Sequence, residues 1–528
     1  MKKAGYDFVY LHKERTARLL AFAAFFACFG TLAAESRFMM IPPGDPALED
    51  LRYVSREAGS AMLSFTPPLS RDEALAVLAA ADPETLSPSA RDAYNRVKER
   101  LTPKMRFSEP FFALSFHAIA EIGGGVRSNP DIPWLGGGGN NLYAMRSPVL
   151  TLPFGFYFAD LIELNLTPSL QQDPYYNERD AYGFTNIPFQ AERIDAYFPF
   201  RAFLAAGGPW WHFQIGRDRL SMGTGHSGNL TLSDTPDYYD FARLSFFSKH
   251  LKYTALVSQM PLFYSEELCD PALWDSRIPD AVLQRHIYVH RLDVNLFGKV
   301  SVGFVEGLNA GSSALEIRYL NPMMILHNLF SYFDYQYWKD NSDSGLNSSF
   351  FSVEVNVTPV KHISVYGQLV VNELTTIFEG DYESEDKQPN ALGYLLGIEY
   401  SRSFGIWGAL FYGEAVYTDP YLYMDNSPLG AMIWMRRMNR FSMTERLMWM
   451  GHPQGRDALL FLIGSRVGKG EDISFSAELA FSLHGEHGLK WDWGSPDGGW
   501  AAGAADEVTP TGQFEKKISL SVAAQWKP

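Results

Sequence analysis

The sequence predicts an all-β fold: a transmembrane antiparallel β-barrel of about 16–18 strands, preceded by a small N-terminal α-helical region. Three observations predict this fold. A two-residue alternation of apolar and polar side chains begins near Phe111 and continues to the C-terminus. Very short turns alternate with long connections along the same part of the chain. The N-terminus has the pattern of an export signal.

Residues 1–34 have the composition of a secretory signal peptide. Five basic residues, the last of them Arg18, precede an apolar run, Leu19 to Ala34, that ends in small residues. This run is shorter than the about 20 residues that a membrane-spanning helix needs, so we expect cleavage near Ala34. An uncleaved anchor helix and lipidation at Cys28 are the alternatives. The chain has two cysteines, and cleavage would remove Cys28 and leave Cys269, so we expect no intramolecular disulfide.

Composition sets the broad class of the protein. The chain has 528 residues, of which 46% are hydrophobic and 20% charged, so it can bury a large core. Its formal net charge of -15 argues against nucleic acid as a partner. Beyond residue 35, no apolar run is long enough for a transmembrane helix, so a membrane could be crossed only by a closed barrel.

Residues 35–106 are predicted to form two or three short helices. Asp45-Pro46 and Ser87-Pro88 each place a capping residue before a proline, and Ser70 with Glu73 has the spacing of a capping box. We expect this region to be a periplasmic plug or lid of the barrel. A small soluble helical appendage is the alternative.

Residues 107–528 are predicted to form the barrel. In the segment 291–296, Leu292, Val294 and Leu296 share one face, and polar side chains share the other. The same alternation recurs at 352–357, 363–372, 474–482 and 518–526. One face would contact lipid and the other would line a polar lumen.

The lengths of the connections support a barrel in the outer membrane of a diderm bacterium. Turns such as 297–299, 359–362 and 468–472 are short, whereas 261–284, 374–391 and 483–513 are long. Short turns at one rim and long loops at the other are typical of outer-membrane barrels. We expect a monomer in contact with outer-membrane lipid and lipopolysaccharide. A soluble β-sandwich or propeller is the alternative.

Several motifs suggest chemistry that their context does not support. The glycines of 223–228 match a dinucleotide-binding pattern, but no helix follows them. Residues 225–229 resemble a hydrolase elbow without its second glycine. Residues 484–487 offer two histidines without helical spacing or a third ligand, and the acidic run 379–386 is typical of an exposed loop. We predict no catalytic residue, no metal and no cofactor.

A polar cluster is predicted in the lumen. Arg217 and Arg219 lie at alternate positions around Asp218, and lipid would be a prohibitive environment for them. Glu316 and Arg318 form a second pair that we expect to point inward. These groups could form a lattice of salt bridges that fills the lumen, or bind sugar hydroxyls and acidic sugars.

The same stretches carry a family resemblance. The motifs are 184–188 through 198–199, 215–223, 228–234, 317–322, 365–369 and the polar pair Asn372-Glu373. Together they resemble the centre of the capsule assembly family Wzi. The resemblance implies an 18-stranded outer-membrane barrel behind a small helical region, with a lectin-like role in holding surface polysaccharide. It adds Asn372 and Glu373 to the predicted lumen cluster, where the family usually has an acidic pair.

Aromatic side chains in two long loops are candidates for binding the glycan. Aromatic rings are common platforms for sugars, although the same residues could form an aromatic girdle or pack within the loops. The candidates are Tyr335, Tyr337, Trp338, Trp491, Trp493 and Trp500.

The function that we predict from the sequence is a non-enzymatic barrel that binds or anchors surface polysaccharide. The alternative is a porin or transporter for small or hydrophobic solutes, with the N-terminal helices as its plug. A barrel enzyme such as a lipid hydrolase would need a nucleophile and a base, which occur at no recognisable spacing, although distant residues could converge.

Overall fold

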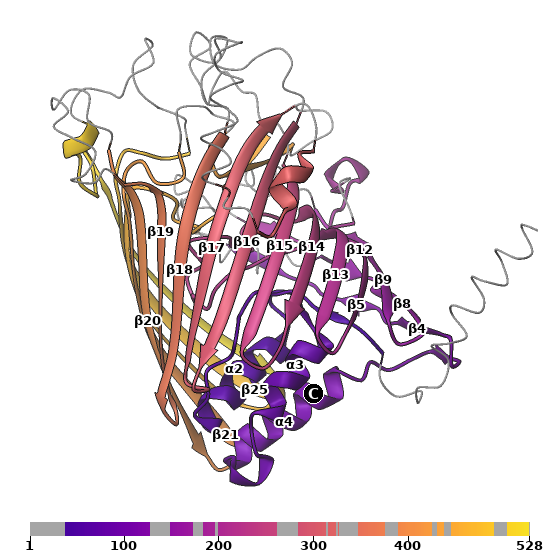
Figure 1. Ribbon diagram of the computed structural model, residues 1–528. Coiled ribbons are helices and arrows are strands. Elements are labelled where there is room, and N and C mark those ends of the chain that lie inside the picture. Colours follow the sequence, from indigo (N-terminus) through magenta and orange to yellow (C-terminus); the bar gives the residue numbers. More distant parts are fainter. Residues whose placement is uncertain are drawn as a thin grey trace, which may run out of the picture.

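The computed structural model describes residues 37–126, 148–172, 183–195, 199–260, 284–312, 315–323, 326, 347–374, 389–424, 430–437, 445–489 and 504–526. Seventeen strands form one antiparallel sheet that closes into a barrel, as predicted (Figure 1). They follow one another around the barrel in chain order: β3 (Phe107–Ser108), β4 (Phe112–Phe116), β8 (Phe154–Phe158), β9 (Ile162–Thr167), β12 (Arg201–Gly208), β13 (Trp211–Asp218), β14 (Tyr239–Phe247), β15 (Leu251–Met260), β16 (Gln284–Leu296), β17 (Val300–Ser312), β18 (Asn347–Val360), β19 (Ile363–Glu373), β20 (Ala391–Phe404), β21 (Trp407–Thr418), β24 (Ala458–Lys469), β25 (Ile473–His484) and β26 (Glu515–Trp526).

Smaller elements accompany the barrel. The short sheets pair β1 (Met40–Ile41) with β2 (Leu69–Ser70), β5 (Ile119–Ala120) and β10 (Ser169–Leu170) with β7 (Leu150–Thr151), β6 (Gly124–Val126) with β11 (Gly183–Thr185), and β22 (Ile433–Arg437) with β23 (Glu445–Trp449). The helices are α2 (Pro46–Ala58), α3 (Arg71–Ala79) and α4 (Pro88–Arg100), with 3-10 turns η1 (Pro83–Thr85), η2 (Ala191–Arg193), η3 (Ile317–Leu320) and η5 (Ala504–Asp506).

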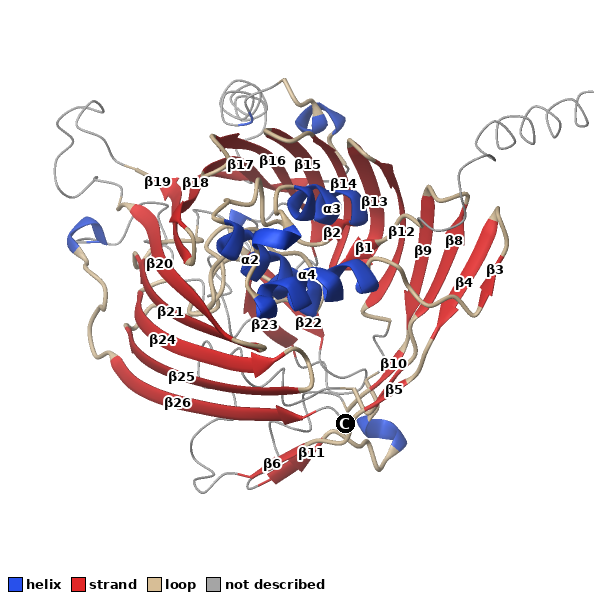
Figure 2. Ribbon diagram, turned by 90° about the horizontal axis from the view of Figure 1, so that it is seen from below, coloured by secondary structure: helices blue, strands red, loops and turns tan. Residues whose placement is uncertain are grey.

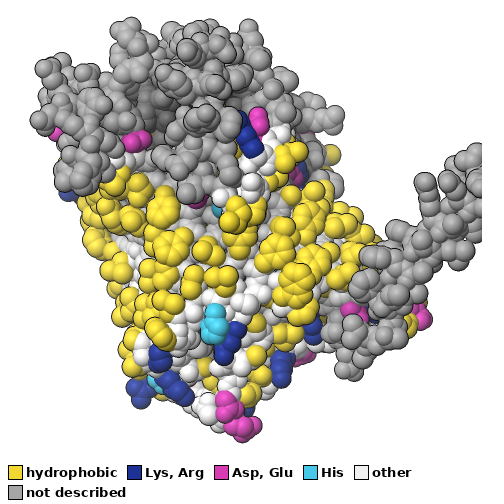
Figure 3. All heavy atoms as spheres, in the orientation of Figure 1, with side chains coloured by type: hydrophobic (Ala, Val, Ile, Leu, Met, Phe, Trp, Pro, Cys, Tyr) yellow, Lys and Arg dark blue, Asp and Glu magenta, His cyan; other side chains and the backbone are white. Residues whose placement is uncertain are grey.

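The predicted alternation sets the two faces of the wall. On β16, Leu292 and Leu296 point outward and are 38% and 42% exposed, whereas Arg291 and Asp293 are buried inside. Apolar side chains cover a broad zone of the outer surface, and charged side chains gather towards the lower rim (Figure 3). This distribution matches the apolar band that a transmembrane barrel presents to lipid.

Tight turns connect the strands at one rim. Phe297 and Gly298 have φ values of 58° and 69°, the left-handed conformation that a short hairpin turn requires. His362, in the turn between β18 and β19, has φ 74°. The opposite ends of the strands, which the long connections of the sequence join, form the other rim (Figure 1). We call these the short-turn rim and the long-loop rim.

The three helices begin where the sequence predicts. Asp45 accepts a hydrogen bond from the Ala47 N–H, and Ser70 and Glu73 form the complete capping box of α3. Seen from the short-turn rim, α2, α3 and α4 lie within the ring of strands (Figure 2). Among the described residues, none of the helices is both long and apolar enough to span a membrane.

Inward-facing tyrosines lie flat along the wall because glycines on the next strand leave room for them. A Cβ atom on Gly397 of β20 would stand 2.1 Å from Cζ of Tyr366 on β19. Tyr412 on β21 covers Gly464 on β24 in the same way, with a Cβ at 2.2 Å from its ring. The glycines therefore give inward aromatic rings a place against the backbone.

Candidate functional site

Three chain segments fill the described part of the lumen. The helical layer, residues 46–100, lies at the short-turn rim. The lumen loop, residues 219–235, connects β13 with β14 and lies against this layer, since the Ser221 N–H donates to the Pro67 carbonyl at 3.0 Å. The lumen hairpin consists of β22 and β23. The lumen loop and the lumen hairpin share one buried apolar cluster with inward side chains of the wall, including Leu230, Leu232, Trp434, Trp449, Ile287, Val305 and Phe350.

Glu399 joins the wall, the helical layer and the lumen loop. It points inward from β20 and is 2% exposed. Its two carboxylate oxygens pair with the guanidinium groups of Arg52 and Arg56, which lie one helical turn apart on α2. Nε2 of His226 lies 2.7 Å from Oε1 of the same carboxylate. One wall residue thus holds two segments of the lumen in place.

Glu414 fixes the fold of the lumen loop. This inward carboxylate of β21 accepts the N–H groups of His226 and Ser227 at 2.8 and 2.9 Å. The hydroxyl of Tyr366 donates to it at 2.7 Å, and the hydroxyl of Ser227 donates to it as well. A buried carboxylate needs several such donors, and Glu414 receives them from three residues.

Ser227 and His452 form a serine–histidine contact that the sequence did not reveal. Oγ of Ser227 lies 2.9 Å from Nε2 of His452. Nδ1 of His452 accepts the Gln454 N–H at 3.2 Å, so in the neutral ring the hydrogen is on Nε2, which donates to Ser227. Burial lowers the pKa of His452 to about 4 and keeps the ring neutral. The serine hydroxyl donates to the Glu414 carboxylate and His452 donates to the serine, so the histidine is not placed as the base of a serine nucleophile.

A second anchor of the helical layer centres on Glu73 of α3. Nε2 of His212 on β13 lies 3.0 Å from its carboxylate, and Lys252 on β15 forms an ion pair with it. The Lys252 ammonium, 1% exposed, also donates to Oγ1 of Thr66 at 2.9 Å. Burial raises the pKa of Glu73, but Lys252 and His212 outweigh it, and the net pKa lies well below the usual range.

The structure separates the three neighbouring residues of the predicted lumen cluster on β13. Asp218 is inside, 1% exposed, and accepts from Nε2 of Gln214 at 3.1 Å. Arg217 lies on the same face of β13 as the outward Ile215, so the prediction that Arg217 points into the lumen was wrong. It pairs instead with Asp240, directly opposite on β14, at 2.8 Å. Arg219 follows the strand, is partly exposed and pairs with Asp234 at 2.7 Å. Arginine is tolerated on the outer face here because Arg217 lies at the strand end, beside an opposite charge.

The predicted inward pair of Glu316 and Arg318 was also wrong. The segment forms the turn η3, and Tyr319 packs with Tyr288 and Leu308. These two wall residues share the outward faces of β16 and β17, which carry the exposed Leu292 and Phe304. Glu316 and Arg318 pair with each other at 3.3 Å against the outside of the barrel. The alternating pattern of this short segment therefore did not indicate a strand.

The remaining predicted residues are dispersed or undescribed. Asn372 points inward from β19 and its Oδ1 accepts the Tyr423 N–H at 3.3 Å, while Glu373 lies at a register irregularity at the end of that strand. Neither lies near β13, which is six strands away around the barrel. The candidate glycan-binding residues lie outside the described residues, as does the predicted signal peptide: Tyr335, Tyr337, Trp338, Trp491, Trp493 and Trp500.

Two motifs have structural roles. Gly223 and Gly228, with φ of 124° and 135°, let the lumen loop fold tightly, and a Cβ on Gly223 would stand 1.9 Å from Nε2 of Gln368. His487, from the two-histidine motif, pairs with Glu507 at 2.8 Å. Within the described ranges, no group of three or more His, Cys, Asp or Glu side chains is placed to hold a metal ion.

Local patterns contain a partial signal for the residues that hold the lumen together. Arg52 and Arg56 have the spacing of one helix face, and Glu399 and Glu414 occupy polar positions of alternating strands. The ion pairs of Arg52 and Arg56 with Glu399 join positions 347 and 343 residues apart, which no local pattern can reveal.

Comparisons with known proteins find likenesses among solved structures. No protein-family model matches the chain, and no curated protein matches it. Among solved structures, a likeness is found to Wzi, an outer-membrane carbohydrate-binding β-barrel involved in group 1 capsule assembly in Escherichia coli, with 13% identity, 92% of this chain and 95% of that chain covered, and a TM-score of 0.49. Another is to the outer-membrane protein OmpT of Vibrio cholerae, with 8% identity, 80% and 99% covered, and a TM-score of 0.34. A loop-deletion mutant of OmpT gives 10%, 70% and 93%, and 0.33. Values this low transfer no function.

Proposed function

We propose that this protein is a sealed outer-membrane barrel that binds or anchors surface polysaccharide at the cell exterior, without enzymatic activity. The filled lumen is the observation that carries the proposal. The helical layer lies within the ring of strands, and the lumen loop and the lumen hairpin pack on inward side chains of the wall, which supports a sealed lumen. The resemblance of the sequence motifs to the Wzi family favours a glycan as the ligand, with the aromatic residues of the long loops as its platforms.

The proposal assigns a role to each region. Residues 1–34 would direct export and be removed, residues 35–106 would close the periplasmic end, and residues 107–528 would hold the long loops at the cell surface as a monomer. Buried ion pairs hold α2 and α3 to the wall through Glu399 and Lys252. Leaving one partner of a buried pair uncompensated costs about 3–5 kcal/mol, so the helical layer is not a loosely docked lid.

Planar-bilayer conductance tests the sealed lumen. We expect no steady conductance from the wild-type protein. The double variant Arg52→Ala/Arg56→Ala removes both guanidinium groups from Glu399 and should produce channel openings. Arg91→Ala is the control, because Arg91 is exposed and lies 3.8 Å from Glu84 on the surface of the helical layer. A steady open channel in the wild type would instead favour the transport function.

Glycan retention tests the ligand. Cells that express Trp491→Ala/Trp493→Ala/Trp500→Ala should retain less surface polysaccharide, and the purified variant should bind it more weakly. Trp210→Ala is the control, since Trp210 is 58% exposed at the short-turn rim. Equal retention by the two variants would remove these tryptophans from the account of binding.

A further inference from the structure

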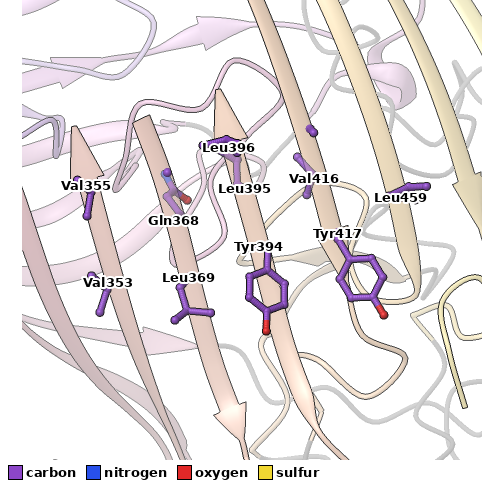
Figure 4. Close-up of a pocket in the computed structure, with 12 residues that line it drawn as sticks. Val353, Val355, Gln368, Leu369, Tyr394, Leu395, Leu396, Val416, Tyr417 and Leu459 are labelled. Atoms are coloured by element: carbon purple, nitrogen blue, oxygen red, sulfur yellow. The ribbon is translucent and has the colours of Figure 1, made fainter. Parts of the chain in front are cut away.

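A groove of about 590 Å³ runs along the outer face of the barrel (Figure 4). Its size falls within the range of about 300–1,000 Å³ that small-molecule sites occupy. It spans five neighbouring strands, β18 to β21 and β24. The outward side chains that line it are apolar except for the tyrosine hydroxyls: Val353, Val355, Leu369, Tyr394, Leu396, Ala415, Tyr417 and Leu459. Gln368, Leu395 and Val416 also border it, but they belong to the inward faces of their strands.

The groove exists because small and large outward residues alternate across the strands. Gly367 pairs with Leu396, which pairs with Ala415. Gly367 has no side chain and Ala415 has one methyl group, whereas Leu396 is 63% exposed and projects from the wall. An acyl chain could therefore lie closer to the backbone here than on the rest of the wall.

Two tyrosines mark one end of the groove. Tyr394 lies near the start of β20 and Tyr417 near the end of β21, both towards the long-loop rim. Their ring centroids are 6.1 Å apart, and Figure 4 shows the two rings side by side. Tyrosines of transmembrane barrels gather at the level of the lipid headgroups. The groove thus begins at this headgroup level and reaches one row of outward residues deeper, to the row that contains Gly367, Leu396 and Ala415.

We propose that the groove binds one acyl chain of a glycolipid of the outer leaflet, of the lipid A type. The groove is continuous with the lipid-facing belt of the barrel, so its occupant has to be hydrocarbon. It opens at the long-loop end, where the outer leaflet presents phosphorylated sugar headgroups, and the hydroxyl of Tyr394 can contact such a headgroup. The site is separate from the filled lumen and does not depend on polysaccharide binding by the loops.

Native mass spectrometry of the full-length protein in detergent, titrated with hexa-acyl lipid A, tests the proposal. We expect one tightly held lipid A on the wild type. Gly367→Leu fills the groove, and binding should weaken about tenfold because the acyl chain loses its apolar contact. A Cβ at Gly367 would stand 3.3 Å from the Leu395 carbonyl oxygen, a tight contact, so the unfolding midpoint of this variant is measured beside its lipid binding. Gly413→Leu is the matched control: it is also outward, its nearest contact is 3.9 Å, and it lies outside the groove.

A second pair of variants tests the headgroup contact. Tyr394→Phe should weaken lipid A binding, whereas Tyr400→Phe should leave it unchanged, because Tyr400 lies on the same face of β20 near the short-turn rim. Equal binding by the wild type and Gly367→Leu would overturn the site. Equal affinity for lipid A and for a phosphatidylethanolamine with chains of the same length would overturn the glycolipid assignment. Neither outcome bears on glycan retention by the long loops.

Discussion

Arg52 of α2 and Glu399 of β20 form a buried ion pair across 347 positions of the chain. Arg56 holds the other oxygen of the same carboxylate, and His226 approaches it from the lumen loop. The buried guanidinium groups of Arg52 and Arg56 therefore meet this carboxylate only when the barrel wall surrounds the helical layer.

Glu399→Gln should strongly destabilise the protein. It removes the carboxylate that Arg52 and Arg56 share, and Arg52 keeps a contact with Glu49 at 3.8 Å. Breaking a comparable buried pair costs about 3–5 kcal/mol. Denaturant unfolding of the detergent-solubilised protein measures the change. Asp472→Asn is the control, since its pair with Lys469 is exposed and 3.9 Å long, and should cost less than about 1 kcal/mol. Similar losses for both variants would contradict the anchoring role of Glu399.

Gly397→Ala should destabilise the wall. The added methyl group would overlap the ring of Tyr366, which also donates to Glu414, and overpacking of this kind typically costs about 1–3 kcal/mol. The comparison is Gly488→Ala, because a Cβ at Gly488 meets nothing within 4 Å. The unfolding midpoints of the two variants give the answer, and an unchanged midpoint for Gly397→Ala would refute the packing argument.

The contribution of Glu73 to stability should depend on pH. Burial raises its pKa, but Lys252 and His212 outweigh it, so the folded-state pKa lies well below the unfolded value of about 4.3. The stabilisation is then fully present above about pH 4.3 and is lost as the pH falls through the folded-state pKa. The difference in free energy of unfolding between wild type and Glu73→Gln should be constant near neutrality and narrow in acid. A difference that widens in acid would reverse the assigned sign.

Ser227 should be unreactive. Its hydroxyl donates to Glu414, and Nε2 of His452 donates to it rather than accepting its proton. A fluorophosphonate probe for activated serines should therefore not label the wild-type protein, and lipid esters should not be hydrolysed. Labelling of the wild type that disappears in Ser227→Ala would show an activated hydroxyl and contradict the prediction.

The sequence predicts the barrel and the helices because their signals are local. Alternation of side chains defines each strand, and Ser70 with Glu73 caps α3 within four residues. Which face looks inward is less local: Arg217 was assigned to the lumen from its charge, yet Asp240 on the next strand allows it to lie outside. The residues that hold the lumen together, such as Arg52 and Glu399, meet only through the closed barrel.

The position of the helical layer also constrains how the molecule is assembled. Residues 46–100 leave the ribosome before any strand of the barrel, but Arg52 and Arg56 find their carboxylate only when β20 is in place. Contacts this distant in sequence form late, because the long intervening chain has to be ordered first. We therefore expect the helices to be enclosed while the sheet closes around them, and not to be inserted into a finished barrel.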